Sequence, residues 1–438
     1  MIPELRDGII IANHARNTSY PLAEAANDAG YLRKFVTGVY HKPSTPFGRV
    51  LEALAGRVGE KDLGRLRGRR NERLPDDKVA SVPLPELVEE GVGRALARHG
   101  RDRRAAVYLK CEAFDWIVSR RHVEPCTIFH GFEQCALFSL RRARSLGATT
   151  VLDQQIIHRT ELDRIEREER ARLGVPAPTE RPFWFQQHVD RKYAEHEVTD
   201  YVFAGLDMVK RTMVKNGFAA DRVFVIPYGT DVRVQPSFDR PSRDRPSRDR
   251  LEVLYVGPVH YWKGLPYLLE IMAMLEVPAR LTIVGRTEPD WAAYFAPRMA
   301  ALGERCRYLG PVPSGEMPKV YADADVLVFP GPTGGIGLVC YEAMAMGLPV
   351  ITADGDVVIR HEVDGLSVPF GDLEGWKQAL TGLAQSPERR RTLGAAGAER
   401  VKAFSWEAYR RGVVDAYETI WERERGARAG AARRAKAS

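Results

Sequence analysis

The sequence predicts an α/β protein with two domains, each a parallel sheet covered by helices. Short apolar runs of strand length alternate with stretches of helical spacing over residues 8–231 and again from residue 251. At 438 residues the chain is also too long for one compact core. Residues 239–250 read DRPSRDRPSRDR, a charged repeat without large apolar residues that cannot bury a face. We therefore predict a first domain at residues 1–235, a linker at 236–250 and a second domain at 251–403.

The first domain opens with a strand, a helix and a second strand over residues 8–38. Further strands are predicted at CTIFH, TTVLD and DYVFA, with helices between them. Open parallel sheets bind ligands beyond the carboxyl ends of their strands. His130 and Asp153 end two of these predicted strands, so both are candidate site residues. The alternative for a single histidine such as His130 is a role in packing or in a loop.

The second domain begins with the strand LEVLYVG and continues through the strands LTIVG and VLVF. Residues 326–353 then place a strand, a glycine-rich turn, a short helix and another strand in succession. Free backbone N–H groups at Gly337, Leu338 and Val339, together with the helix dipole, favour a phosphate at this turn. Glu342 follows Gly337 by five residues, roughly 7.5 Å along a helix, where a carboxylate can accept both hydroxyls of a ribose.

Two other interpretations of this segment stay open from the residues alone. Glycine-rich turns from a strand to a helix occur in many parallel sheets for packing, and a single glutamate on a helix usually faces solvent.

Composition and charge limit the function classes. The net charge of +7 and the pI near 9.1 predict contact with an anionic molecule or surface. Five scattered cysteines without C-x-x-C spacing indicate neither a disulfide framework nor a zinc site, and they suit a reducing cytoplasm. Neither a signal peptide nor a run of roughly 18 apolar residues is apparent. We therefore expect a cytoplasmic protein that does not span a membrane.

The string GLVCYEAMAMGLPV at residues 337–350 resembles the second half of retaining glycosyltransferases of the GT-B fold. This large family, glycosyl transferases group 1, includes sucrose synthase and bacterial mannosyltransferases. Its usual string is E-G-F-G-L-x-x-x-E-A-M-A-x-G-x-P-V, so its second Glu corresponds to Glu342, whereas Gly334 replaces its first Glu and Ile336 its Phe. The family loop G-R-x-x-x-x-K-G is matched at Lys263, but Pro258 stands where the Arg would be.

The resemblance implies two Rossmann-like domains that face each other across a cleft. FSWEAYRRGVVDAYETIW resembles the closing helix of the family, so a helix at residues 404–424 should cross back to the first domain. A disordered basic tail is predicted at 425–438.

The resemblance also implies an activity, in which a sugar moves from a nucleotide-diphosphate sugar to an acceptor with retention at the anomeric carbon. The acceptor is a glycan, a lipid-linked molecule or a small molecule. Neither a metal nor a cofactor is expected, and the two D-x-D strings at 323–325 and 354–356 are interpreted as a helix end and a turn. The implied catalytic residues are His130, Lys263 and Glu342. The donor-binding residues are His260, as a second positive group, and also Gly334, Gly335, Gly337, Leu338, Val339 and Glu342. The candidates on the acceptor side are Asn13, Arg16 and Asp153.

Several alternatives remain at this point. The replacements at Gly334 and Pro258 are also compatible with a non-catalytic GT-B protein that binds a nucleotide or a glycan, and a phosphorylase of the same fold is a further candidate. The basic cluster RLRGRRNER at residues 65–73 is either a solvated face or a patch that rests on an anionic membrane. Nucleic acid is not expected as a partner, because the cluster lacks interleaved aromatic residues.

Overall fold

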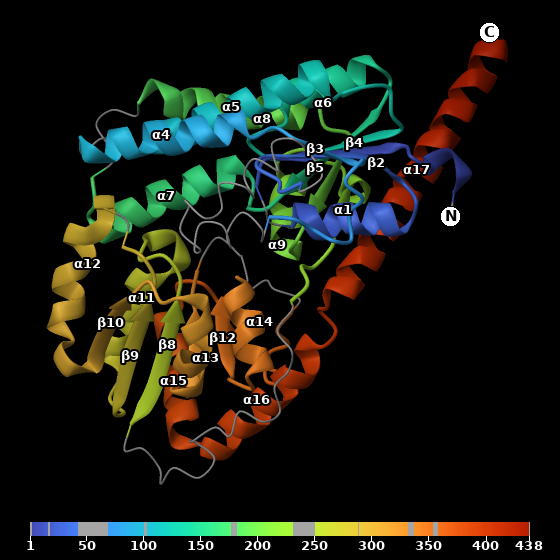
Figure 1. The fold of residues 1–438 in the computed structure, drawn as a ribbon. Helices are drawn as coiled ribbons and strands as arrows, with labels where there is room; N and C mark the ends of the chain where they lie inside the picture. The colour runs from blue at the N-terminus through green and yellow to red at the C-terminus, as the bar shows by residue number, and fades with distance from the viewer. Residues whose placement is uncertain are drawn as a thin grey trace.

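Two parallel sheets form the frame of the molecule (Figure 1). The structure is a computed structural model that describes residues 2–15, 18–42, 69–99, 103–176, 182–230, 250–287, 289–331, 337–353 and 358–437. Two Rossmann-like domains with a helix that crosses between them were predicted, and this fold class is confirmed.

The first sheet has seven strands in the order β3-β2-β1-β4-β5-β6-β7, and all neighbouring strands are parallel. Its strands are β1 (Ile9–Asn13), β2 (Leu32–Thr37), β3 (Val79–Ser81), β4 (Ile128–Phe132), β5 (Thr149–Gln154), β6 (Tyr201–Ala204) and β7 (Val223–Val225). The central strands β1, β4 and β5 are buried at every position, because helices cover both faces of the sheet. The strand order reverses between β1 and β4, which is the kind of point where open sheets bind ligands.

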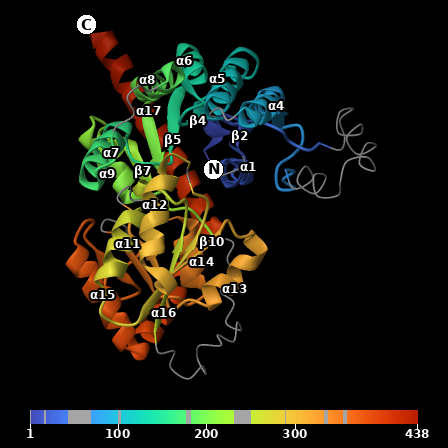
Figure 2. The same ribbon diagram turned by 90° about the vertical axis from the view of Figure 1, so that its left-hand side faces the viewer.

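The helices of the first domain pack on the two faces of this sheet (Figures 1 and 2). They are α1 (Ser19–Asp28), α4 (Leu84–Arg98), α5 (Arg104–Arg121), α6 (Leu137–Ser145), α7 (Arg159–Leu173), α8 (Phe183–Glu197) and α9 (Asp207–Lys215).

The second sheet has six parallel strands in the order β10-β9-β8-β11-β12-β13. Its strands are β8 (Leu251–Val256), β9 (Ala279–Val284), β10 (Cys306–Gly310), β11 (Val326–Phe329), β12 (Val350–Ala353) and β13 (Leu366–Val368). The short 3-10 helix η3 (Tyr261–Lys263) precedes the first of its helices, which are α11 (Leu265–Met274), α12 (Pro289–Ala301), α13 (Met317–Ala322), α14 (Leu338–Ala345), α15 (Leu373–Gln385) and α16 (Pro387–Val401). The charged linker predicted at 236–250 lies outside the described residues except for Arg250.

The last helix, α17 (Trp406–Ala437), runs from the second domain back along the first, past α1 (Figure 1). Tyr409, Val413, Tyr417 and Ile420 are buried in the same apolar cluster as the strands of the first sheet. The disordered tail predicted from residue 425 is wrong, because the helix continues to Ala437. Alanine, arginine and lysine dominate this segment and are strong helix formers, so an established helix extends through them.

The two domains also meet through α7, which packs on the second domain (Figure 2). The Tyr267 hydroxyl donates to the Glu169 carboxylate at 2.5 Å, and Arg172 pairs with Glu270 at 2.9 Å. The guanidinium of Arg170 lies 5.2 Å from the centre of the Trp291 ring. These contacts hold α7 against α11 and α12, and α7 also lies beside η3, which carries Lys263, one of the predicted catalytic residues. Among the helices of the described residues, none has both the length and the apolar character that a membrane crossing requires.

Candidate functional site

Two loops of the second domain touch where β8 and β11 end. A Cβ atom on Gly264 would lie 2.1 Å from the Pro330 carbonyl oxygen, and one on Gly331 would lie 3.2 Å from the Lys263 Cα. Gly264 also has a φ of +74°, a left-handed conformation that glycine adopts without steric strain. The glycine of the Lys-Gly motif is therefore a structural requirement, because it lets the Lys263 backbone lie against the turn that leads to α14.

Lys263 projects a partly buried ammonium group beside this turn. Its Nζ atom lies 5.3 Å from the centre of the Phe329 ring, and burial lowers its pKa. Within the parts of the chain that the structure describes, no carboxylate forms an ion pair with it. A cation that is partly desolvated and has no such partner is suited to bind an anion.

Helix α14 begins at Leu338, as the sequence predicted, and Gly337 is its N-cap residue. Gly337 makes no side-chain cap hydrogen bond, so the first N–H groups of the helix suit an anion on the helix axis. Gly334 and Gly335 lie outside the described residues, and so do Arg16 and the string at 354–356. Their predicted roles stay predictions.

Glu342 lies on the next turn of α14, where its Oε2 atom accepts a hydrogen bond of 2.6 Å from the Tyr321 hydroxyl. Tyr321 is almost fully buried, and both burial and the contact with Glu342 raise its pKa. This contact fixes the direction of the carboxylate, and no residue in the described ranges hydrogen-bonds its Oε1 atom. No local pattern pointed to Tyr321 as a partner, because the two residues are on different helices, α13 and α14.

His260 does not supply a second positive charge, contrary to the sequence prediction. Its Nδ1 atom accepts a hydrogen bond from the Trp262 N–H at 3.4 Å, and its ring packs against Tyr261 and Trp291. Burial, assisted by the nearby charges of Arg170 and Arg104, lowers its pKa to about 3. The imidazole is therefore neutral near pH 7 and caps η3.

His130 lies in the hydrophobic core and not at the end of a strand. β4 begins two residues later than predicted, so His130 is the third of its five residues and is 0% exposed. Its Nδ1 atom is 2.7 Å from the Tyr417 hydroxyl of α17, and its ring contacts Phe132 and Phe203. Burial lowers its pKa to about 3. In this structure His130 packs beneath α17 and cannot reach a ligand, which corrects the catalytic role expected for it.

Asn13 and Asp153 do lie at the carboxyl end of the first sheet. Asn13 ends β1, where its Oδ1 atom accepts from the Ala15 N–H at 3.3 Å and from Cys135 Sγ at 3.7 Å. Asp153 is the fifth of six residues in β5, and burial, followed by the charge of Glu133, raises its pKa to about 8. Both side chains are buried, at 2% and 3% exposure. Their contact with an acceptor stays a prediction.

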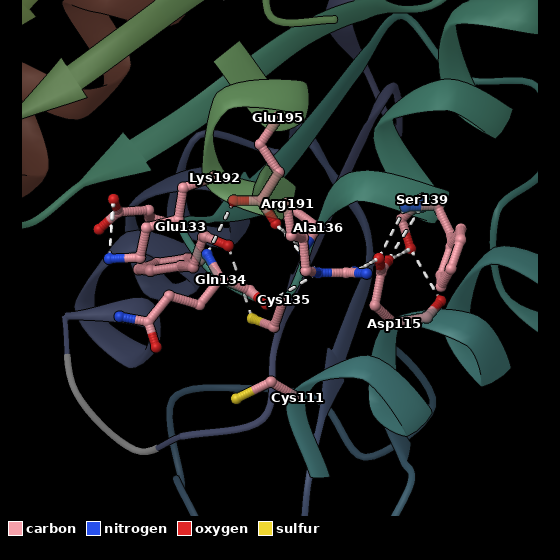
Figure 3. Close-up of polar contacts among 12 residues, drawn as sticks. Cys111, Asp115, Glu133, Gln134, Cys135, Ala136, Ser139, Arg191, Lys192 and Glu195 are labelled. Carbon is pink, nitrogen blue, oxygen red and sulfur yellow. Dashed lines mark hydrogen bonds and ion pairs between the residues drawn. The ribbon is translucent and has the colours of Figure 1, made fainter. Parts of the chain in front are cut away.

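Sequence reasoning missed a network of buried charges beneath the loop after β4 (Figure 3). It consists of Asp115, Glu133, Arg191, Lys192 and Glu195, which come from α5, α8 and the loop itself. Arg191 pairs with Asp115, whose carboxylate accepts from the first N–H groups of α6, and Lys192 pairs with Glu133 at 3.1 Å. Burial raises the pKa of Glu195 to about 7. The only local signal was the spacing of Arg191 and Glu195, four residues apart on one helix.

Comparison with known proteins places these loops within a family. The model of the family described as "Glycosyl transferases group 1" matches residues 250–386, which include Lys263, Gly337 and Glu342. The D-inositol 3-phosphate glycosyltransferase of Segniliparus rotundus is 31% identical over 231 residues, which cover 48% of this chain and 51% of that protein. The phosphatidyl-myo-inositol mannosyltransferase of Mycobacterium leprae is 32% identical over 165 residues, or 36% and 43% of the two chains. The chain spans about half the length of the curated relatives it matches.

Solved structures resemble the fold over both domains. Anabaena Alr3699/HepE in complex with UDP has a TM-score of 0.57 at 14% identity, with 94% of this chain and 100% of that chain covered. The sucrose-phosphate synthase of Thermosynechococcus elongatus has a TM-score of 0.57 at 19% identity, with 94% and 99% covered. At such low identity these structures show the fold alone. Residues 250–386, which hold both of these loops, thus match the glycosyl transferases group 1 family, and the chain has the GT-B fold.

Proposed function

We propose that the protein is a glycosyltransferase that moves a sugar from a nucleotide-diphosphate sugar to a hydroxyl group of an acceptor. The observation that carries this proposal is the joint placement of Lys263, the N-terminus of α14 and Glu342 around two touching loops of the second domain. Lys263 and the helix start suit a diphosphate, and Glu342 suits a ribose. The structural neighbour Alr3699/HepE was solved in complex with UDP, which supports a nucleotide donor here.

The proposed chemistry depends on negative charge that develops on the leaving diphosphate. An ammonium group and fixed N–H groups that point at this charge stabilise the transition state more than the ground state. We propose that the transfer proceeds with retention and without a metal, because the leaving phosphate itself can take the proton of the attacking hydroxyl. A second protein carboxylate is then unnecessary, in contrast to glycosidases.

The acceptor is assigned to the first domain, whose strand ends carry Asn13 and Asp153. Glycans, lipid-linked molecules and small molecules all fit the proposal, and the names of the relatives add inositol phosphates and phosphatidylinositol to the acceptors worth testing.

We also propose that the first domain contacts an anionic membrane surface. The described part of the predicted basic cluster is paired with acids, as in Arg69 with Glu86 at 2.5 Å, so it is not the main support. The support comes from α4 and α5, where Leu84, Leu109 and Trp116 are exposed and Arg120 lies 5.4 Å from the Trp116 ring centre. Tryptophan beside arginine suits the interface of a bilayer.

Vesicle binding tests this contact directly. Trp116→Ser should reduce sedimentation with phosphatidylglycerol vesicles, whereas Ser in place of Phe183, an exposed apolar residue of α8, should not. If the Trp116 variant binds the vesicles as well as the unchanged protein does, α5 is not part of the proposed membrane-binding surface.

The transfer reaction is tested by product analysis. The protein is incubated with UDP-glucose or GDP-mannose and a set of acceptors, and the released products are separated. Nucleoside diphosphate supports transfer, and the anomeric configuration of the product, read by NMR, tests retention. Sugar phosphate formed from inorganic phosphate would indicate a phosphorylase. Donor binding without any product would indicate a binding protein; a donor at about 100 times its Kd should stabilise the fold by about 2.7 kcal/mol.

A further inference from the structure

Gln134, in the loop after β4, has an unusual backbone conformation. Three non-glycine residues have a positive φ in the described ranges, and Gln134 has the largest value, +82°, compared with +47° for Asp7 and +63° for Glu362. A residue with a Cβ atom is strained in this region, and a glycine at the same position would not be. Such strain persists only where the surroundings impose it, and it is concentrated at functional sites.

Buried charges impose this conformation on Gln134. The two carboxylate oxygens of Glu195 accept from the N–H groups of Gln134 at 2.8 Å and Ala136 at 2.9 Å. Arg191 Nε donates to the Gln134 carbonyl at 3.1 Å, and Arg191 is itself paired with the fully buried Asp115. Charges held away from water are costly unless their partners are well placed. The fold therefore holds the main chain on both sides of Gln134 in one arrangement.

The side chain of Gln134 takes no part in these hydrogen bonds. In Figure 3 its amide points away from Arg191 and Glu195. The side chain is partly exposed, and its amide has no hydrogen bond to any residue within the described part of the chain. The main-chain groups of Gln134 are thus fixed, while its amide can still donate and accept one hydrogen bond or more.

The Gln134 amide lies at the carboxyl edge of the first sheet, where a ligand of the first domain is expected. Gln134 follows β4, and β4 borders β1 at the point where the strand order reverses. From the loops on either side, Gln155 Nε2 donates to Thr18 Oγ1 at 3.3 Å. The nearest charged side chain in the loop, Glu133, is buried against Lys192. This edge thus carries the amides of Gln134 and Gln155 and the Thr18 hydroxyl group, and neutral groups of this kind suit an uncharged ligand with hydroxyl groups.

From this arrangement we propose that Gln134 determines acceptor specificity by hydrogen-bonding a hydroxyl group of an uncharged sugar or polyol acceptor. The inference rests on the proposed glycosyl transfer and adds the chemical class of the acceptor and the residue that contacts it. The strained backbone sets the direction in which the side chain leaves the main chain, and the charge network holds that backbone in place.

Gln134→Gly tests the inference because it removes the amide and also relieves the strain, so the fold should be at least as stable. The control is Asp7→Gly, which removes another side chain at positive φ from the same domain, at the opposite end of β1. The donors are UDP-glucose and GDP-mannose, and the acceptor probes are the methyl glycosides of glucose, galactose and mannose, myo-inositol, and myo-inositol 1-phosphate as the charged probe. Release of nucleoside diphosphate is measured for each pair.

We expect the unchanged protein to use at least one uncharged probe, and Gln134→Gly to raise the KM for that acceptor about tenfold, as for the loss of a hydrogen bond to a ligand. The KM for the donor should not change, and Asp7→Gly should leave both values as they are. Gln134→Asn, which tolerates positive φ but has a shorter side chain, should show the same selective effect on the acceptor.

An unchanged acceptor KM in Gln134→Gly overturns the inference. The inference also fails if the unchanged protein transfers the sugar only to myo-inositol 1-phosphate or only to water. Failure of the proposed function is distinguishable, because the unchanged protein would then neither bind the donors nor release nucleoside diphosphate from them.

Discussion

Replacing Lys263 with methionine should change stability and donor binding in opposite directions. Lys263 is partly buried beside Phe329, burial lowers its pKa, and no described carboxylate compensates its charge. Methionine has a similar length and no charge, so Lys263→Met should melt at the same temperature as the unchanged protein or higher. A hydrogen bond to a charged group contributes about 1.5–3 kcal/mol, so the Kd for a nucleoside diphosphate should rise about 10- to 150-fold.

The assay combines thermal melting of the ligand-free protein with calorimetric titration of UDP and GDP. Lys402→Met is the matched control, because Lys402 is exposed in the same domain and pairs only with Glu399 among the described residues. That variant should bind as tightly as the unchanged protein. Because a bound diphosphate should raise the lowered pKa of Lys263, binding should also take up protons and weaken as the pH rises through that pKa. An unaltered affinity of Lys263→Met for UDP and GDP, or a clear decrease in its melting temperature, would refute the reasoning.

The site and its surroundings lead to four more expected outcomes. Glu342→Gln keeps an acceptor for the Tyr321 hydroxyl but loses the charge, so calorimetry should show nucleotide affinity reduced about 5- to 10-fold; an unchanged Kd would remove Glu342 from the site. In the folded protein the pKa of Asp153 is about 8, whereas in an unfolded chain it is about 3.9. Between these two pH values the folded state keeps a proton that the unfolded state releases. The free energy of unfolding should therefore fall as the pH rises from about 3.9 to about 8. Asp153→Asn should flatten this part of the pH profile of urea unfolding, and an identical slope in the variant would contradict it. Prolonged EDTA treatment should leave initial transfer rates unchanged, whereas complete loss restored by manganese would disprove metal independence. Gly334→Glu should lower the rate with the native donor, because it adds bulk and negative charge near the diphosphate; a gain on common hexose donors would mean instead that the site had merely degenerated.

The order of strands and helices was predictable because it depends on local patterns. Apolar runs, helical spacing and glycine positions act over a few residues, so β11, the start of α14 and the Lys-Gly loop were found where the sequence indicated them. The same local signals carried the family resemblance, and the match to residues 250–386 confirms it. The sequence by itself thus determined the fold class and the domain that carries the family motif, and it singled out Lys263 and Glu342, whose roles at the donor stay predictions.

The tertiary structure decided the environment of each side chain, since that depends on residues far apart in the chain. His130 became a core residue because Tyr417, 287 positions later, lies over it. His260 lost its expected charge because aromatic rings bury it. The backbone of Gln134 is set by Glu195, which is 61 positions away. Desolvation and ion pairing fix which groups carry charge and where they point, and both arise only when the chain brings distant residues together.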